Sequence, residues 1–224
     1  MTDPQRIAAN VASVRREIAA ACARRGRDPA AVTLMAVTKN QPPDVLEPLR
    51  QAGVRDFGEN RVEHLQEMLA HRQPGDHWHY IGRVQGRQLA KLAPQIDALH
   101  SLCDPDHVDR LARPCIQAGR RLPVYVQANA SGETAKAGIA PAGLANLLAS
   151  IRAQPALDPV GLMTMAPELG SQADEDAVRE CFARLRGLAA EHHLAGLSMG
   201  MSGDLAIAVE EGATIVRVGS MLFA

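Results

Sequence analysis

The chain has 224 residues, of which 46% are hydrophobic and 22% charged, and its formal net charge is −1. This balance does not favour binding to nucleic acid or to an anionic membrane, and an aromatic content of 3% argues against a base-stacking surface. No apolar run approaches the roughly 20 residues that span a bilayer, and the polar N-terminus lacks the apolar core of a signal peptide. We therefore expect a cytoplasmic protein that binds neither nucleic acid nor membrane.

Apolar runs of strand length alternate with longer segments of helical period along the whole chain. The first segment, 4–25, is predicted to be a helix, because Asp3 can cap it and Pro4 suits the first helical position. The predicted strands are 32–39, 54–59, 77–82, 96–102, 122–129, 157–165, 193–199 and 214–219. Helices are predicted between them at 42–53, 60–72, 85–93, 104–119, 141–153, 173–193 and 203–211.

This regular alternation predicts an α/β fold with parallel strands. Eight such units in a chain of this length predict a single (β/α)8 TIM barrel, with residues 1–224 forming one domain. The alternative is an open doubly wound sheet, but the first strand–helix turn, TKNQPPD, lacks a glycine-rich fingerprint. The N-terminal helix could cap the bottom of the barrel or pack on a partner, so we expect a monomer or a weak homodimer.

The active site of a TIM barrel lies at the C-terminal ends of its strands. Lys39 follows the first predicted strand directly, and apolar surroundings there would favour the neutral amine that Schiff-base chemistry needs. An ordinary lysine that reaches solvent is an equally good interpretation of this residue alone.

Small residues cluster after the last two predicted strands, in SMGMSGD (198–204) and VGS (218–220). Main-chain N–H groups in such turns can point into one space, and loops at these positions of a TIM barrel commonly bind phosphate. The alternative is two tight turns with Ser202 as a helix cap.

Arg217 stands out inside the last apolar strand. Strand alternation puts Ile215, Arg217 and Gly219 on one face of the strand. If that face lines the barrel interior, the guanidinium needs an acceptor or an anion, such as a cofactor ring nitrogen or a carboxylate. A salt bridge to a neighbouring strand or helix is the alternative.

Together these segments resemble a known family, the pyridoxal 5′-phosphate (PLP) homeostasis proteins of the YggS/PROSC type. The segments that carry the resemblance are AVTKNQPPDVLEPLRQAGVRDFGENRVEHLQE, WHYIGRVQGRQ, NASGETAKAGI, GLMTMAP and LSMGMSGDLAIAVEEGATIVRVGSMLF. They follow one another in order through almost the whole chain, so the chain is identified as a member of this family.

The resemblance implies a barrel like the N-terminal domain of alanine racemase, with PLP held as a Schiff base on Lys39. It implies an arginine near the pyridine nitrogen, here Arg217, and places Asn60 and His79 around the cofactor. The residues implied to hold the phosphate are Met199, Ser202, Gly219 and Ser220.

The chain departs from the family pattern mainly after the third predicted strand. Arg83 stands where histidine is common, and Gly86, Arg87 and Gln88 replace the usual SNK. The family's SNDM becomes SGDL here, and the final glycine becomes Ala224. A family role of the third-strand loop is therefore not carried over to this chain.

The resemblance implies a carrier and buffer of PLP that maintains the vitamin B6 and amino/keto-acid pools, with transfer of PLP to apo-enzymes as a further role. The alternative is a PLP-dependent enzyme of amino acids, similar to a racemase, which needs an acid/base on each face of its substrate. We expect no dedicated activity, with weak racemization left open. We foresee no second domain to supply a tyrosine, Tyr125 lies mid-strand, and Tyr80 would have to face the barrel interior. A zinc hydrolase using His77 and His79 is a third interpretation, but it lacks a third ligand at motif spacing.

Overall fold

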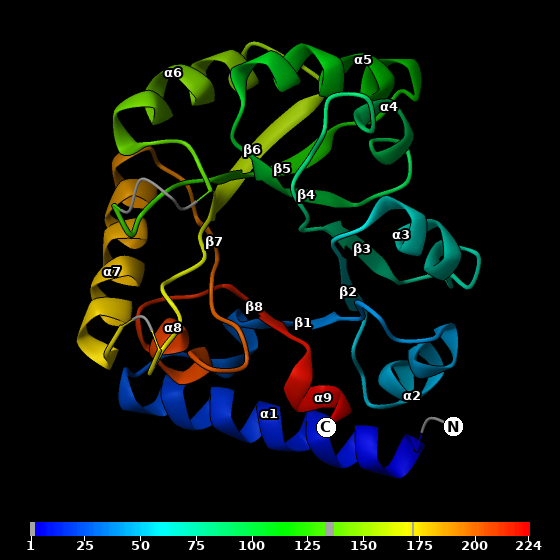
Figure 1. The fold of residues 1–224 in the computed structure, drawn as a ribbon, viewed down its shortest axis with the longest axis vertical. Helices are drawn as coiled ribbons and strands as arrows, with labels where there is room; N and C mark the ends of the chain where they lie inside the picture. Colours follow the sequence, from blue (N-terminus) through cyan, green and yellow to red (C-terminus); the bar gives the residue numbers. More distant parts are fainter. Residues whose placement is uncertain (1–2, 133–136, 172) are drawn as a thin grey trace.

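The computed structural model describes residues 3–132, 137–171 and 173–224, and these contain a closed parallel barrel (Figure 1). Each strand pairs with the next, and β8 pairs back to β1 with Met35 opposite Arg217. The strands are β1 (Thr33–Val37), β2 (Asp56–Glu59), β3 (His77–Tyr80), β4 (Ala98–Leu102), β5 (Leu122–Gln127), β6 (Leu157–Met163), β7 (Gly196–Ser198) and β8 (Ile215–Val218). The predicted TIM barrel is therefore confirmed, and the open doubly wound sheet is ruled out.

Helices surround this barrel on the outside, one or more between successive strands (Figure 1). They are α1 (Pro4–Arg24), α2 (Leu46–Gln51), α3 (Val62–Leu69), α4 (Leu89–Leu92), α5 (Val108–Gln117), α6 (Pro141–Arg152), α7 (Glu175–Glu191), α8 (Leu205–Glu210) and α9 (Ser220–Phe223). Three short 3-10 turns lie at Pro29–Ala31, Pro43–Val45 and Pro105–His107. The predicted helices are all present, and several are shorter than expected. Within the described residues, no helix combines the length and the apolar character needed to cross a bilayer.

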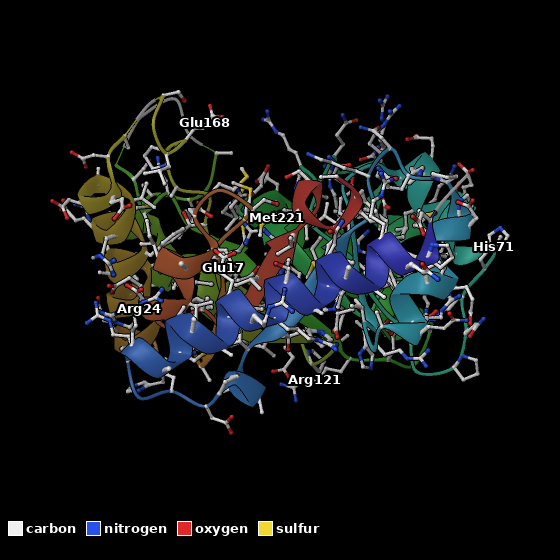
Figure 2. All side chains as sticks on the ribbon, turned by 90° about the horizontal axis from the view of Figure 1, so that it is seen from below. Glu17, Arg24, His71, Arg121, Glu168 and Met221 are labelled. Atoms are coloured by element: carbon white, nitrogen blue, oxygen red, sulfur yellow. The ribbon has the colours of Figure 1, made fainter. Side chains whose placement is uncertain are left out.

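Helix α1 lies along the side of the barrel, beside α2, α8 and α9, rather than across its bottom (Figures 1 and 2). Asp3 caps it as predicted, by accepting hydrogen bonds from the main-chain N–H groups of Gln5 and Arg6. The Asn10 amide donates to the carbonyls of Leu222 and Ala224, each at 3.2 Å. The helix therefore ties the C-terminal segment to the seam where the first and last strands pair.

The interior of the barrel contains an apolar cluster of Met35, Tyr125, Met163 and Ile215. The side chains of Met35 and Tyr125 fit only because the residues next to them on neighbouring strands are glycines. A Cβ on Gly58 would lie 2.6 Å from the Met35 sulfur, and one on Gly161 would lie 2.6 Å from the Tyr125 ring. The burial of Ile215 here confirms that the Ile215–Arg217–Gly219 face of β8 points inward.

The close packing around Tyr125 gives a stability prediction. A Cβ on Gly161 would also lie 2.2 Å from the Gly196 carbonyl oxygen, which belongs to the paired strand and cannot move away easily. We expect Gly161→Ala to lower the free energy of unfolding in urea by about 3 kcal/mol, as overpacking does. The matched control is Gly187→Ala on α7, where a Cβ meets nothing within 4 Å. That control is expected to gain up to about 1 kcal/mol from helix propensity. Equal stability of the two variants would contradict the packing account.

Candidate functional site

A cavity of about 750 Å³ opens at the C-terminal ends of the strands. Six of the residues predicted for the site line it, namely Lys39, Asn60, Ser202, Arg217, Gly219 and Ser220. The remainder of the lining is largely apolar and includes Met163, Met165, Leu169 and Met201. Figure 2 shows Glu168, also in the lining, at the opposite end of the molecule from Arg121, which precedes β5. The predicted end of the barrel therefore carries a pocket of ligand size.

Lys39 lies in the turn that follows β1, at the mouth of the cavity. Its side chain is exposed and forms no hydrogen bond or ion pair with a described residue. The next residue, Asn40, has a φ of 62°, a left-handed conformation that asparagine tolerates better than most residues. Lys39 therefore lies at the cavity mouth as expected, but its side chain is exposed there and not enclosed by apolar groups. The amine is free to react.

A buried carboxylate supports this turn from below. Glu59, at the end of β2, is fully buried and accepts a hydrogen bond from the Thr38 hydroxyl, next to Lys39. Its second oxygen lies 2.9 Å from Nδ1 of His64 on α3, and Nε2 of His64 lies 3.0 Å from the Gln41 carbonyl. Burial alone would lower the pKa of His64, but the Glu59 carboxylate raises it overall. This Glu59–His64 pair thus holds both ends of the Lys39 turn.

Arg217 forms part of the cavity floor with its guanidinium buried. Nη1 donates to the Ser198 carbonyl at 2.7 Å and to the Ser198 hydroxyl at 3.1 Å, while Nη2 donates to the Thr164 carbonyl at 3.0 Å. Burial lowers its pKa to about 10, and the charge of Asp204 offsets part of that effect. No carboxylate lies within ion-pair distance of it in the described part of the chain, so the alternative of a salt bridge fails. A buried cation held only by neutral acceptors favours an anionic or electron-rich ligand.

The turn after β7 provides donors on another side of the cavity. The main-chain N–H groups of Ser202 and Gly203 donate to no described residue, whereas that of Met201 donates to the Asp204 carboxylate at 2.5 Å. Gly200 lets the turn approach α8, because its φ is 93° and a Cβ there would lie 2.5 Å from that of Ala208. Burial raises the pKa of Asp204, and the hydrogen bond from the Met201 N–H and the charge of Arg217 offset part of that rise. Two open amides and the neighbouring serine hydroxyl make a turn suited to phosphate.

Two of the residues expected near the cofactor lie outside the cavity lining. Met199 is fully buried in the core, and its N–H is used in a hydrogen bond to the Ile215 carbonyl. His79 lies deeper in the barrel interior, against Asp56 and His100. Both can act on the site only through other residues.

Neither tyrosine lines the cavity. Tyr80 is buried outside the barrel interior, and its hydroxyl donates to the Asn60 carbonyl at 3.2 Å. Tyr125 stacks on His100 with 4.2 Å between ring centroids, and burial raises its pKa to about 12. Its predicted packing role agrees with this placement. His77 and His79 share Asp56 as a partner, but the described residues contain no group of three or more side chains that could hold a metal ion.

The sequence reasoning missed the Thr38–Glu59–His64 support. The signal available was Glu59 itself, an acidic residue at the end of an apolar strand, where a buried carboxylate needs a partner. Part of the NASGETAKAGI segment, residues 133–136, lies outside the described residues.

Comparison with known proteins agrees with this geometry. The family model for the alanine racemase N-terminal domain matches residues 2–224. The pyridoxal phosphate homeostasis protein of Pseudomonas aeruginosa is 39% identical over 223 residues, which cover 97% of this chain and 94% of that protein. The chain belongs to the pyridoxal phosphate homeostasis protein family.

Solved structures extend this assignment to the fold. PipY of Synechococcus elongatus, solved with PLP bound, is 32% identical with a TM-score of 0.81, over 94% of this chain and all of that one. The alanine racemase of Corynebacterium glutamicum has a TM-score of 0.76 at 16% identity, over 99% of this chain and 62% of the racemase. The pyridoxal phosphate homeostasis protein fold is thus shared with the racemase barrel.

The Glu59–His64 pair gives a pH prediction. A pKa raised in the folded state stabilises the protein fully below the unfolded value of about 6.5, and this contribution is lost as pH rises through the folded pKa. We expect His64→Gln to be less stable than wild type in urea at pH 5.5, and the difference to shrink by pH 9. His71→Gln, which changes an exposed histidine, serves as control and should follow wild type at both pH values. A stability difference that grows with pH would contradict the assignment.

Proposed function

We propose that this chain binds PLP covalently through Lys39 and serves as a carrier and buffer that maintains the PLP pool. One observation carries the proposal: a single cavity brings together a free lysine amine, a buried arginine without a carboxylate partner and open main-chain amides. The family assignment and the PLP-bound PipY structure support it.

The residues present fit each functional group of PLP. When bound, PLP supplies an aldehyde that bonds reversibly to an amine. Lys39 offers that amine at the cavity mouth, while Ser202, Gly203, Gly219 and Ser220 offer amides and hydroxyls for a phosphate. Arg217 can only donate hydrogen bonds, so it would pair with an unprotonated ring nitrogen. Asn60 lines the cavity beside these groups, and Met199 would contribute by packing under the phosphate turn.

The same residues favour holding PLP over using it. An arginine that faces the ring nitrogen leaves it unprotonated, which weakens the ring as an electron sink. The hydroxyl of Tyr80 is hydrogen bonded to Asn60, and Tyr125 packs deep in the barrel, so each tyrosine is held by other contacts. These contacts support a protein that stores PLP and limits free aldehyde. By releasing PLP to apo-enzymes, it would indirectly maintain the amino- and keto-acid pools.

The alternative is a PLP-dependent enzyme of amino acids. The PLP-loaded protein should exchange the α-proton of amino acids in deuterated water no faster than free PLP does. NMR of each amino acid, with free PLP as the control, measures this exchange. Exchange of one amino acid well above the free-PLP rate would favour the enzyme.

The covalent bond to Lys39 can be tested directly, because the sequence contains three lysines, Lys39, Lys91 and Lys136. After reduction of the PLP-loaded protein with borohydride, peptide mass mapping should find the PLP adduct on Lys39. Lys39→Ala should lose the visible absorbance of bound PLP. Lys91→Ala, on α4, is the matched control and should keep it. An adduct mainly on another lysine, or a wild-type protein without the band, would refute the proposal.

A further inference from the structure

The barrel interior carries a group of polar side chains of which the proposed function uses only Arg217. They lie beside the apolar cluster described above, on strands β2, β3, β4, β7 and β8. Their members are Asp56, His79, His100, Ser198 and Arg217. His100 and Ser198 are fully buried, and His79 and Arg217 nearly so. Polar groups this deep in a core are costly unless each finds a partner.

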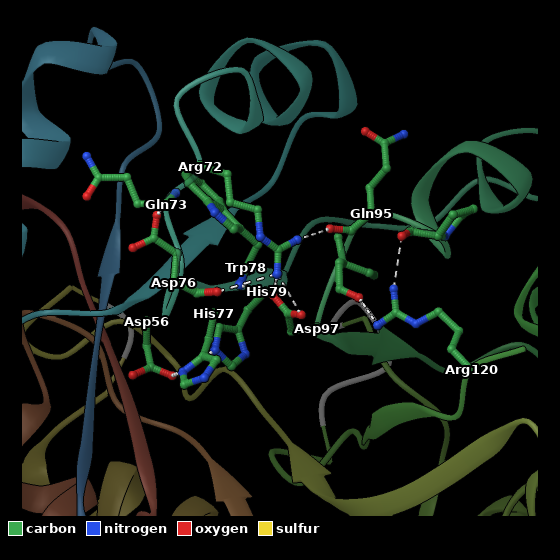
Figure 3. Close-up of polar contacts among 12 residues, drawn as sticks. Asp56, Arg72, Gln73, Asp76, His77, Trp78, His79, Gln95, Asp97 and Arg120 are labelled. Atoms are coloured by element: carbon green, nitrogen blue, oxygen red, sulfur yellow. Dashed lines mark hydrogen bonds and ion pairs between the residues drawn. The ribbon is translucent and has the colours of Figure 1, made fainter. Parts of the chain in front are cut away.

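Each of these five side chains has a partner, and together they form one continuous chain of hydrogen bonds. Nη1 of Arg217 donates to the Ser198 hydroxyl at 3.1 Å, and that hydroxyl lies 2.8 Å from Nδ1 of His100. Nε2 of His100 lies 3.0 Å from Nδ1 of His79, and Nε2 of His79 lies 3.0 Å from the Asp56 carboxylate. Figure 3 shows the far end, where His77 and His79 both face Asp56. This chain of hydrogen bonds thus crosses the barrel from the cavity floor to the first residue of β2.

The two ends of this chain fix its direction. Arginine only donates hydrogen bonds, and an ionised carboxylate only accepts them. Burial lowers the pKa of His100 well below its usual range, with smaller effects from His79 and Arg217, so this ring is neutral. One arrangement then satisfies every group: Ser198 donates to His100, His100 donates through Nε2 to His79, and His79 donates through Nε2 to Asp56. A hydrogen on Nδ1 of His100 would instead leave the Ser198 hydroxyl hydrogen without an acceptor in the chain.

We propose that Ser198, His100, His79 and Asp56 are positioning residues that hold the Arg217 guanidinium toward PLP, so that Asp56 affects cofactor binding from the opposite end of the barrel. This inference rests on the proposed function for its ligand. It assigns His79 a role at a distance from the cavity, since His79 is not part of the lining and its hydrogen bonds are to His100 and Asp56.

The test compares Ser198→Ala and Asp56→Ala with wild type, measuring the dissociation constant for PLP and the absorbance maximum of bound PLP. Each variant should bind PLP about tenfold more weakly, the scale of one hydrogen bond to a charged group. Both should shift the absorbance maximum in the same direction. Because the two residues act through one chain, the double variant should be no weaker than Ser198→Ala alone. Asp56→Asn keeps an acceptor for His79 and should recover most of the affinity.

Two controls separate this role from general damage to the barrel. Asp158→Ala removes a carboxylate from the start of β6, where Asp158 pairs with the exposed Arg121. Tyr125→Phe removes a hydroxyl from the interior and keeps the ring that stacks on His100. Both should bind PLP within twofold of wild type, with an unchanged absorbance maximum. If Asp56→Ala behaves like Asp158→Ala, or if the effects of Asp56→Ala and Ser198→Ala simply add, the inference is wrong.

A measurement without ligand keeps the inference separate from the proposed function. Nitrogen NMR of the imidazoles in the PLP-free protein should show hydrogen on Nε2 of both His79 and His100. Asp56→Ala should change the signals of both rings, and Asp158→Ala neither. Hydrogen on Nδ1 of His100 in wild type would contradict the proposed direction of the hydrogen bonds, and with it the inference, even if PLP binds. Failure of wild type to bind PLP, with these signals as expected, would instead refute the proposed function.

Discussion

A guanidinium buried inside a closed barrel needs hydrogen-bond acceptors. In the case of Arg217, the acceptors that the protein provides are all uncharged. Two main-chain carbonyls and the Ser198 hydroxyl hold it, and no carboxylate comes within ion-pair distance among the described residues. The positive charge is therefore left facing the cavity instead of being cancelled within the protein. We regard this uncompensated charge as the feature on which the site depends, because it favours an electron-rich ligand at the cavity floor beside Arg217.

The rest of the barrel interior and the turn above it support Arg217 and the cavity. In the interior, Met35, Tyr125, Met163 and Ile215 pack against each other, and glycines on the neighbouring strands leave room for Met35 and Tyr125. Beside this cluster, the hydrogen-bonded chain leads from Arg217 to Asp56. Above them, the Glu59–His64 pair holds the turn that presents Lys39. Rigid support below and a free amine above suit a site that takes up and releases a cofactor by one reversible bond.

The fold could be predicted from the sequence because strand and helix periods alternate so regularly, and because the strand ends of a parallel barrel meet at one face. Arg217 was visible as a charged residue inside an apolar strand, and its inward face followed from alternation. The chain of hydrogen bonds through His100 could not be predicted from the sequence. It depends on the register of strands far apart in the sequence, and nothing local to ALHSL says which strand its histidine will meet.

Two residues of the predicted site have surroundings that differ from the expected ones for local reasons. Lys39 is exposed because β1 ends at Val37 and Lys39 already lies in the turn that follows, whereas the apolar pattern extends the predicted strand to Lys39. Met199 was placed near the phosphate by resemblance, but its N–H donates to the Ile215 carbonyl, and the Gly200 carbonyl after it still accepts from the Arg217 N–H of β8. At the turn after β7, two residues along the backbone separate Met199, which is buried in the core, from Met201, which lines the cavity.

The most direct test of this account is a crystal structure of the protein with PLP. We predict continuous density from Nζ of Lys39 to the cofactor, the phosphate on the turns at Ser202–Gly203 and Gly219–Ser220, and the ring nitrogen facing Arg217. A phosphate bound elsewhere, or a ring whose nitrogen faces away from Arg217, would contradict it.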